Sequence, residues 1–216
     1  MKDTQLLAYL QKVIENIPND WLKLTTHRLD VYNEGLAKTE FLEKLEALFE
    51  DNNATTSALS ELPTAYDYIR LGHPLSSVLE WAIAKAKNLK ADQVISFSSK
   101  TIPILAVLRK NLFDHKKTQI LYKGNLPEFF DPETVKSVYG YDFDLKQIDR
   151  PEDVAAFEGS IIFIEERAKI GQVEFHSNID FFIQTHAQLG SNLIINGEAN
   201  ESYVSAIQHV RRRETI

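Results

Sequence analysis

The 216-residue sequence contains no cysteine, which excludes disulfide bonds, thiolate nucleophiles and thiolate-bound zinc. No apolar run approaches the roughly 18 residues of a membrane-spanning helix, and residues 1–5 do not begin a signal peptide. Acidic residues number 31 against 24 basic ones, and the net charge of -7 opposes attraction to nucleic acid or an anionic membrane. We therefore expect a cytoplasmic protein that binds neither of them.

Several motifs of common enzymes are missing as well. The sequence has no Gly-x-Ser-x-Gly turn, no P-loop and no dinucleotide-binding glycine pattern, which removes the commonest hydrolase, nucleotide-hydrolysing and dehydrogenase interpretations. The six histidines form no short-spaced pair on a helix face, so we predict no metal site. Glu165-Glu166 and the run from Arg211 to Arg213 are interpreted as solvated charges, the run at the end of a helix.

Apolar residues in the first 50 positions recur at helical spacing. The first such stripe consists of Leu6, Leu7, Leu10, Val13, Ile14 and Ile17. A second helical region is predicted from Trp21 to about Phe49, with a break near Gly35, and residues 51–63 are rich in the Asn, Thr and Ser of a loop. We therefore expect an N-terminal helical arm over residues 1–62.

After Pro63, predicted helices alternate with short β-branched or aromatic runs. Strands are predicted at residues 94–98, 118–123, 143–148, 160–165 and 192–196. Helices are predicted at residues 77–88, 101–113, 132–138, 151–157, 178–189 and 201–213. This alternation is typical of an α/β domain with a mostly parallel sheet covered by helices, which we expect over residues 63–216.

A short segment after the first predicted strand carries groups that suit a phosphate. Ser98, Ser99, Lys100 and Thr101 lie where a strand gives way to a helix, and hydroxyl and backbone N–H groups there meet the positive end of the helix dipole. Serine and threonine are equally ordinary helix caps. The segment alone therefore leaves a phosphate site and a simple cap both open.

Two motifs together resemble one enzyme family. Residues 68–74, Tyr-Ile-Arg-Leu-Gly-His-Pro, with the later Phe-Ser-Ser of residues 97–99, are similar to the Cys/Met-metabolism family of pyridoxal-phosphate enzymes, the cystathionine synthases and lyases. The resemblance covers roughly residues 66–196 and implies part of a PLP-transferase-like large domain. It also implies that Tyr68 and Arg70 reach the cofactor phosphate across a dimer interface, a role that suits the planar guanidinium of Arg70.

The same resemblance implies roles further along the chain. Tyr122 takes the place of the tyrosine that stacks on the pyridine ring, and Asn196 takes that of the aspartate at the pyridine nitrogen. An amide cannot keep that nitrogen protonated. Lys100-Thr101 replaces a Gly-Met pair, and Lys169 lies near the position of a substrate-binding asparagine. No lysine follows Lys169, so we expect no Schiff base.

These departures favour a truncated, non-catalytic relative that binds pyridoxal phosphate or another phosphorylated small molecule without a covalent bond. The expected cofactor-binding residues are Tyr68, Arg70, Ser98, Ser99, Lys100, Thr101, Tyr122 and Asn196. A homodimer is expected, because a shortened sheet leaves an edge that needs cover. Two alternatives stay open: a pyridoxal-phosphate-dependent transferase or lyase of sulfur amino-acid metabolism completed by a partner chain, and a pure protein-interaction module.

Overall fold

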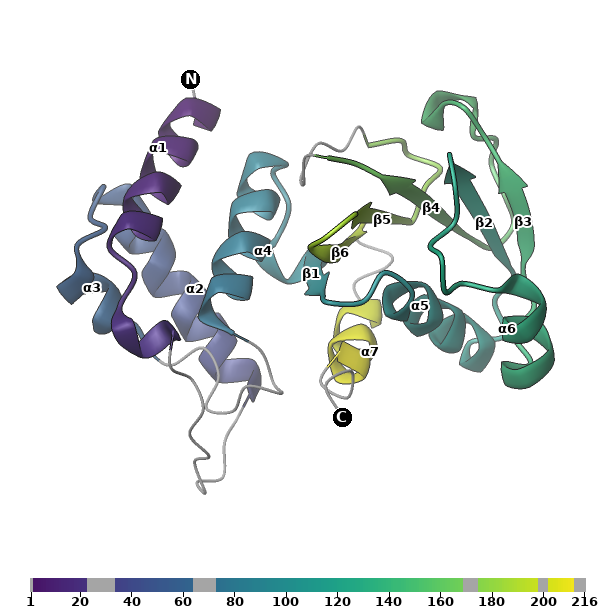
Figure 1. Ribbon diagram of the computed structural model, residues 1–216, viewed down its shortest axis with the longest axis horizontal. Coiled ribbons are helices and arrows are strands. Elements are labelled where there is room, and N and C mark those ends of the chain that lie inside the picture. The colour runs from purple at the N-terminus through teal and green to yellow at the C-terminus, as the bar shows by residue number, and fades with distance from the viewer. Residues whose placement is uncertain (1, 23–33, 64–72, 169–174, 198–201, 212–216) are drawn as a thin grey trace. The chain divides into compact units, whose positions relative to one another are not determined.

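The computed structural model describes residues 2–22, 34–63, 73–168, 175–197 and 202–211 (Figure 1). The chain forms two compact units, which meet in the sequence between Asp92 and Gln93. The sequence analysis placed its division after residue 62. In the structure, helix α4 (Pro74–Ala86) belongs to the first unit, where it packs against helices α1 (Lys2–Glu15) and α2 (Glu34–Glu50). Within the described residues, no helix is long and apolar enough to cross a membrane.

The first unit is helical. It contains α1, α2, α4, the short helix α3 (Thr56–Ser60) and a 3-10 turn at Asn19–Leu22. Its core contains an aromatic cluster, in which the ring of Tyr9 meets those of Phe49 and Trp81 edge to face, with ring centroids 5.1 and 6.2 Å away. Glu46 of α2 accepts a hydrogen bond of 2.7 Å from the Trp81 indole and joins α2 to α4.

Helix α4 begins at Pro74, the last residue of the predicted motif at residues 68–74, and His73 is its N-cap residue. The Nδ1 atom of His73 accepts a hydrogen bond of 3.1 Å from the backbone N–H of Leu75 and caps the helix. Burial lowers the pKa of His73, and a hydrogen bond with the Trp21 backbone partly offsets this effect. His73 therefore has a structural role at the start of α4.

The second unit is a six-stranded mixed sheet with helices (Figure 1). Its elements in chain order are β1 (Val94–Phe97), α5 (Ile102–Phe113), β2 (Thr118–Lys123), α6 (Pro132–Tyr139), β3 (Asp144–Gln147), β4 (Ser160–Glu166), β5 (Phe181–His186), β6 (Gly190–Ile195) and α7 (Ser202–Arg211). The strand order is β1-β6-β5-β4-β2-β3. Strand β6 runs antiparallel to both of its neighbours, and the other strands all run in one direction.

Helices α5 and α7 pack against each other on one face of the sheet (Figure 1). Alternate residues along each strand point to this face. The core between the layers includes Ile95, Ile120, Ile162, Ile183 and Leu193 from the strands, Ile104 and Leu108 from α5, and Tyr203 and Ile207 from α7. The apolar residues that alternate along the strands and those that recur at helical spacing along α5 and α7 therefore form one apolar layer.

A buried polar chain fixes α7 to α5. The Tyr203 hydroxyl donates to Asn111 Oδ1 at 2.6 Å, and Asn111 Nδ2 donates to Thr118 Oγ1 at 2.8 Å. Tyr203 is 3% exposed, and burial, with Asp114 and Asp180 adding to it, raises its pKa to about 12. The hydroxyl is therefore protonated at neutral pH and available as the donor that Asn111 needs.

The predicted α/β class, with a mostly parallel sheet covered by helices, is confirmed. The helix predicted at residues 178–189 is wrong, because β5 occupies the middle half of that range. The helix predicted at residues 151–157 is also wrong and shortens to a 3-10 turn at Pro151–Asp153. The loop predicted at residues 51–63 contains α3, and Gly35, the predicted break, lies in the first turn of α2. The intervening residues 23–33 lie outside the described residues.

The error at β5 has a clear physical cause. The run Phe181-Phe182-Ile183 is compatible with a buried strand or a buried helix, so its sequence pattern does not separate the two. Pairing with β4 and β6 makes it a strand. A three-residue loop joins His186 of β5 to Gly190 of β6, whose φ of +85° is in the left-handed region. His186 Nδ1 accepts the N–H groups of Gln188 and Leu189 and closes this turn.

Candidate functional site

The carboxyl ends of the parallel strands meet at one edge of the sheet, which we call the carboxyl edge. The strands β1, β2, β4 and β5 all end there, at Phe97, Lys123, Glu166 and His186. Open α/β sheets bind ligands in the crevice beyond this edge, because the loops that leave it are free to carry polar groups. The carboxyl edge is therefore the first place to look for a site.

A cavity of about 580 Å³ lies at the carboxyl edge. It is lined by Lys100, Lys123, Gly124, Asn125, Leu126, Pro127, Glu128, Glu165, Glu166 and Thr185. These residues come from the loop before α5, the end of β2 with its following loop, the end of β4 and the end of β5. Its volume falls within the roughly 300–1,000 Å³ of small-molecule sites.

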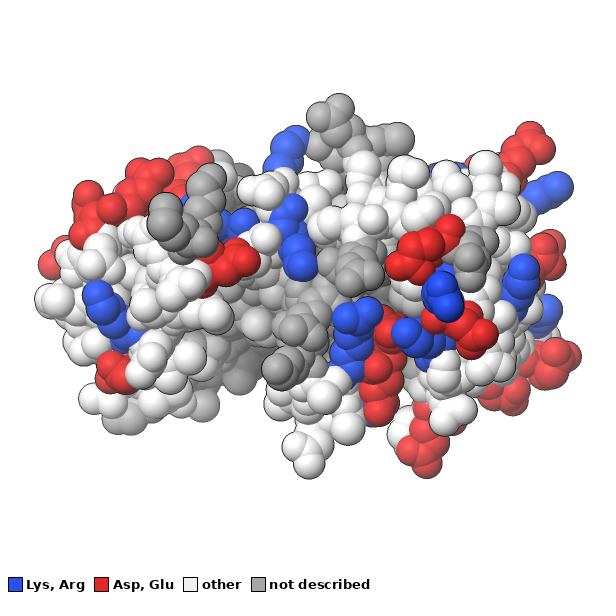
Figure 2. All heavy atoms as spheres, turned by 90° about the horizontal axis from the view of Figure 1, so that it is seen from above, with Lys and Arg blue, Asp and Glu red and all other residues white. Residues whose placement is uncertain are grey.

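The two lysines of this cavity are each paired with a carboxylate. Lys100 Nζ lies 3.5 Å from Glu166 Oε2, and Lys123 Nζ lies 3.4 Å from Glu165 Oε1. Glu165 Oε2 also accepts a hydrogen bond of 2.5 Å from Arg167 Nε. On the face of the α/β unit that Figure 2 shows, acidic and basic side chains are intermixed rather than gathered by sign.

Polar side chains also form a row across the sheet. The strand register places Ser96 beside Asn192, Asn192 beside Gln184, Gln184 beside Glu165, and Glu165 beside Lys123. These five side chains share the face of the sheet opposite α5 and α7, because their strand neighbours point into the core on the α5 side. The row therefore runs along the sheet just inside the carboxyl edge.

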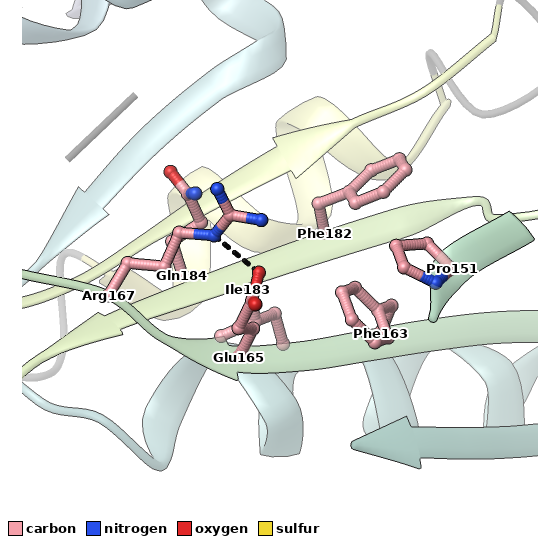
Figure 3. A pocket seen from close by; sticks show the side chains of 7 residues that line it. All are labelled: Pro151, Phe163, Glu165, Arg167, Phe182, Ile183 and Gln184. Atoms are coloured by element: carbon pink, nitrogen blue, oxygen red, sulfur yellow. Dashed lines mark hydrogen bonds and ion pairs between the residues drawn. The ribbon is translucent and has the colours of Figure 1, made fainter. Parts of the chain in front are cut away.

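The row is buried in its middle. Asn192 and Gln184 are 2% and 5% exposed, and Asn192 Oδ1 has no hydrogen-bond partner within the described part of the chain. Arg167 lies over the sheet beside Gln184 and Glu165 (Figure 3). The hollow between them, which Phe163 and Phe182 also line, has about 10 Å³, room for a single water molecule. This hollow is too small for a ligand, whereas the larger cavity has room for one.

Four predicted site residues form the loop that leads into α5. Ser99 Oγ accepts the N–H groups of Thr101 and Ile102, at 3.1 and 3.2 Å, and lies 3.1 Å from Thr101 Oγ1. The Ser99 side chain therefore satisfies backbone N–H groups at the start of α5, whose N-cap residue is Thr101. Ser98 is exposed, and Lys100 is the only one of the four that lines the cavity.

Tyr122 and Asn196 do not join this loop in one site. Tyr122 is half-buried, and its side chain packs against the core on the α5 side of the sheet. Asn196 follows β6, which runs antiparallel, so it lies at the opposite edge of the sheet beside the start of β5. Its amide Nδ2 donates to the carbonyls of His176 and Ile179, at 3.2 and 2.8 Å. With a helix predicted at residues 178–189, the next strand was expected to run parallel to the others, so the sequence analysis did not place Asn196 at the opposite edge.

Tyr68 and Arg70 lie outside the described residues, as does Lys169. The cofactor-binding roles of all eight predicted residues stay predictions. No group of three His, Asp or Glu side chains that could hold a metal ion occurs in the part of the chain that the structure describes.

The sequence analysis missed most of the cavity. It interpreted Glu165 as solvated, whereas its side chain is only 12% exposed and contacts Lys123 and Arg167, and that interpretation is wrong for Glu165. Glu166, at 57%, is solvated as predicted. A usable signal was the position of Lys123 and Glu165 at the ends of two predicted strands, because the ends of parallel strands meet at one edge.

Comparisons with known proteins give distant likenesses only. No family model matches the sequence, and no curated protein matches it. The structure is similar to metB from Corynebacterium glutamicum, at 12% identity and a TM-score of 0.36, over 85% of this chain and 65% of that one. It is also similar to a putative O-acetylhomoserine (thiol)-lyase, metY, from Campylobacter jejuni, whose structure contains N'-pyridoxyl-lysine-5'-monophosphate.

The second likeness has 13% identity and a TM-score of 0.29, and covers 62% of this chain and 43% of that one. The chain thus spans less than two thirds of the length of either structure. These are likenesses of fold, and neither family membership nor an activity follows from them.

Proposed function

We propose that the protein binds a small phosphorylated molecule, without a covalent bond, in the cavity at the carboxyl edge. The observation that carries this proposal is that Lys100 and Lys123, from separate elements, line one cavity of about 580 Å³. Lysine binds phosphate as a compact point charge with three donors. The cavity lies where open α/β sheets bind their ligands, which supports the same function.

The lysines can exchange their present partners at small cost. Their ion-pair distances of 3.5 and 3.4 Å are longer than the 2.7–2.9 Å typical of a strong charged hydrogen bond. The Lys100 and Lys123 side chains are 31% and 47% exposed, and such partly exposed pairs contribute about 0.2–1 kcal/mol. A phosphate with two negative charges is thus able to replace the carboxylates.

Pyridoxal phosphate is the phosphorylated compound that the sequence resemblance names, and the described residues fit only part of it. Lys100 suits the phosphate group. The pyridine ring finds no matching pair, because Tyr122 packs into the core and Asn196 lies at the opposite edge. We therefore derive no catalytic step through the cofactor, and the proposal is one of binding.

Isothermal titration with pyridoxal phosphate and with inorganic phosphate tests this function. We expect saturable binding by the wild type and about a two- to fivefold weaker affinity in Lys100→Ala and Lys123→Ala, because each variant removes one partly exposed ion-pair partner of the phosphate. Lys44→Ala, on the exposed face of α2 in the other unit, is the matched control and should bind as the wild type does. Absence of binding by the wild type, or equal affinity in all variants, would contradict the proposal. A borohydride-trapped adduct on a lysine would contradict its non-covalent part.

The expected homodimer belongs to the same proposal and is supported by the charges of the edge strand β3. All four side chains of β3 are exposed, and charges on an edge strand oppose pairing unless charges of opposite sign face each other. An antiparallel pair of two β3 strands centred on Leu145 would place Asp144 of one copy opposite Lys146 of the other, so the charges attract. Light scattering of the wild type should give twice the mass of one chain. Lys146→Asp should lower this mass, and the double variant Asp144→Lys with Lys146→Asp should restore it. A wild type of single-chain mass contradicts this.

A further inference from the structure

The cavity at the carboxyl edge carries charges of both signs in close contact. Three carboxylates, Glu128, Glu165 and Glu166, and two ammonium groups, Lys100 and Lys123, line it. A site built for an anion alone has no use for carboxylates beside its cations, because they compete with the ligand for the same ammonium groups. The mixed lining therefore carries information about the ligand.

Binding of a phosphate to the lysines would leave one of the two neighbouring carboxylates with a partner and the other without one. Glu165 keeps the hydrogen bond from Arg167 when Lys123 turns to the ligand. Glu166 is paired with Lys100 in the described structure, and a phosphate on Lys100 takes that partner away. A negative charge then stands beside the bound phosphate, which weakens binding unless the ligand itself supplies a positive group.

From this difference we infer that the ligand carries a protonated amine close to its phosphate, with Lys100 on the phosphate and Glu166 on the amine. The inference rests on the proposed binding function and adds the chemical class of the ligand, a phosphorylated amine. Because Lys100 Nζ and Glu166 Oε2 lie only 3.5 Å apart, a ligand that meets both groups needs its own two charges close together, and a short linker of about two carbons fits. Four charges of alternating sign then meet at the cavity wall.

The test compares two probes that differ only in the amine, O-phosphoethanolamine and ethyl phosphate, by titration calorimetry at low salt. We expect the wild type to bind O-phosphoethanolamine about three- to fivefold more tightly, the contribution of one partly exposed ion pair. In Glu166→Gln this preference should disappear. The amine of O-phosphoethanolamine then has no carboxylate to pair with, and Lys100, no longer paired with Glu166, binds the phosphate of both probes more readily.

Two variants serve as controls. Glu158→Gln removes an exposed carboxylate outside the cavity and should change neither affinity. Glu165→Gln should change both affinities by the same factor, because Glu165 stays with Arg167 and does not contact the amine.

The outcomes separate the two proposals. Equal affinity of the wild type for both probes, or the same preference in Glu166→Gln as in Glu158→Gln, overturns the amine assignment and leaves phosphate binding standing. If neither probe binds and pyridoxal phosphate and inorganic phosphate also fail, the proposed function falls with the inference.

Discussion

Replacing Gly190 with alanine should destabilise the α/β unit more than any other glycine-to-alanine change in the described sheet and its connections. Gly190 closes the β5–β6 turn with a φ of +85°. A Cβ atom there would lie 2.1 Å from the carbonyl oxygen of Phe97 and 2.7 Å from that of Ser98. Both are backbone atoms of the β1 end, so no side-chain rotation relieves the overlap.

The expected magnitude has two parts. A left-handed backbone costs a residue with a Cβ about 1–2 kcal/mol. Inserting a methyl group into filled space costs about 1–3 kcal/mol more, because strand or loop backbone has to shift. Gly190→Ala should therefore lower the free energy of unfolding by about 2–5 kcal/mol, the sum of both costs.

Gly140→Ala is the matched control. Gly140 ends α6 with a φ of +68°, and a Cβ there meets no atom within 4 Å, so only the backbone cost of about 1–2 kcal/mol applies. Urea unfolding followed by circular dichroism gives both values. If the two variants differ by less than about 0.5 kcal/mol, the steric argument is refuted. Because Ser98 begins the loop that carries Lys100, Gly190→Ala should also weaken phosphate binding, whereas Gly140→Ala should not.

Three further predictions concern the polar contacts of the two units. Tyr203→Phe removes the donor to Asn111 Oδ1, and urea unfolding should show that the free energy of unfolding falls by about 1–3 kcal/mol. The pKa of Tyr203 in the folded protein is raised to about 12, so the stability of the wild type should fall as the pH rises from 10 through 12. The variant should lack this fall. Asn196→Asp removes the amide donor to the carbonyls of His176 and Ile179, so the free energy of unfolding should fall by about 1–3 kcal/mol. The affinity for phosphate should stay unchanged. Tighter phosphate binding by this variant would contradict the position of Asn196 at the opposite edge of the sheet. The pKa of His73 is lowered, so the unfolded chain takes up the proton first and stability should fall below about pH 6.5; His73→Asn keeps a helix cap and should abolish that fall in acid unfolding curves.

The sequence predicted most elements of the α/β unit, because their patterns are locally complete. The helix at residues 102–113 begins with a serine and threonine segment and carries a continuous apolar stripe, and its predicted bounds differ from α5 by one residue. The strand at residues 160–166 is a buried run flanked by polar residues, as parallel strands are. Such signals lie within a few residues of one another and need no knowledge of the fold.

The failures occurred where a distant contact decides the structure. Residues 181–186 suit a helix or a strand by pattern, and pairing with β4 and β6 makes them a strand. The helix at residues 74–86 has an ordinary amphipathic pattern, and its packing on α1 and α2 decides which unit it joins. Sequence periodicity states which face of an element is apolar and does not state which partner covers that face.

By itself, the sequence determined the α/β class and the absence of thiol chemistry, because composition and local spacing fix both. The tertiary structure alone decided which charged residues share a cavity. Lys123 and Glu165 are more than forty positions apart and meet because β2 and β4 are parallel neighbours. The reversed direction of β6 moved Asn196 to the opposite edge, and only the strand pairing reveals that direction.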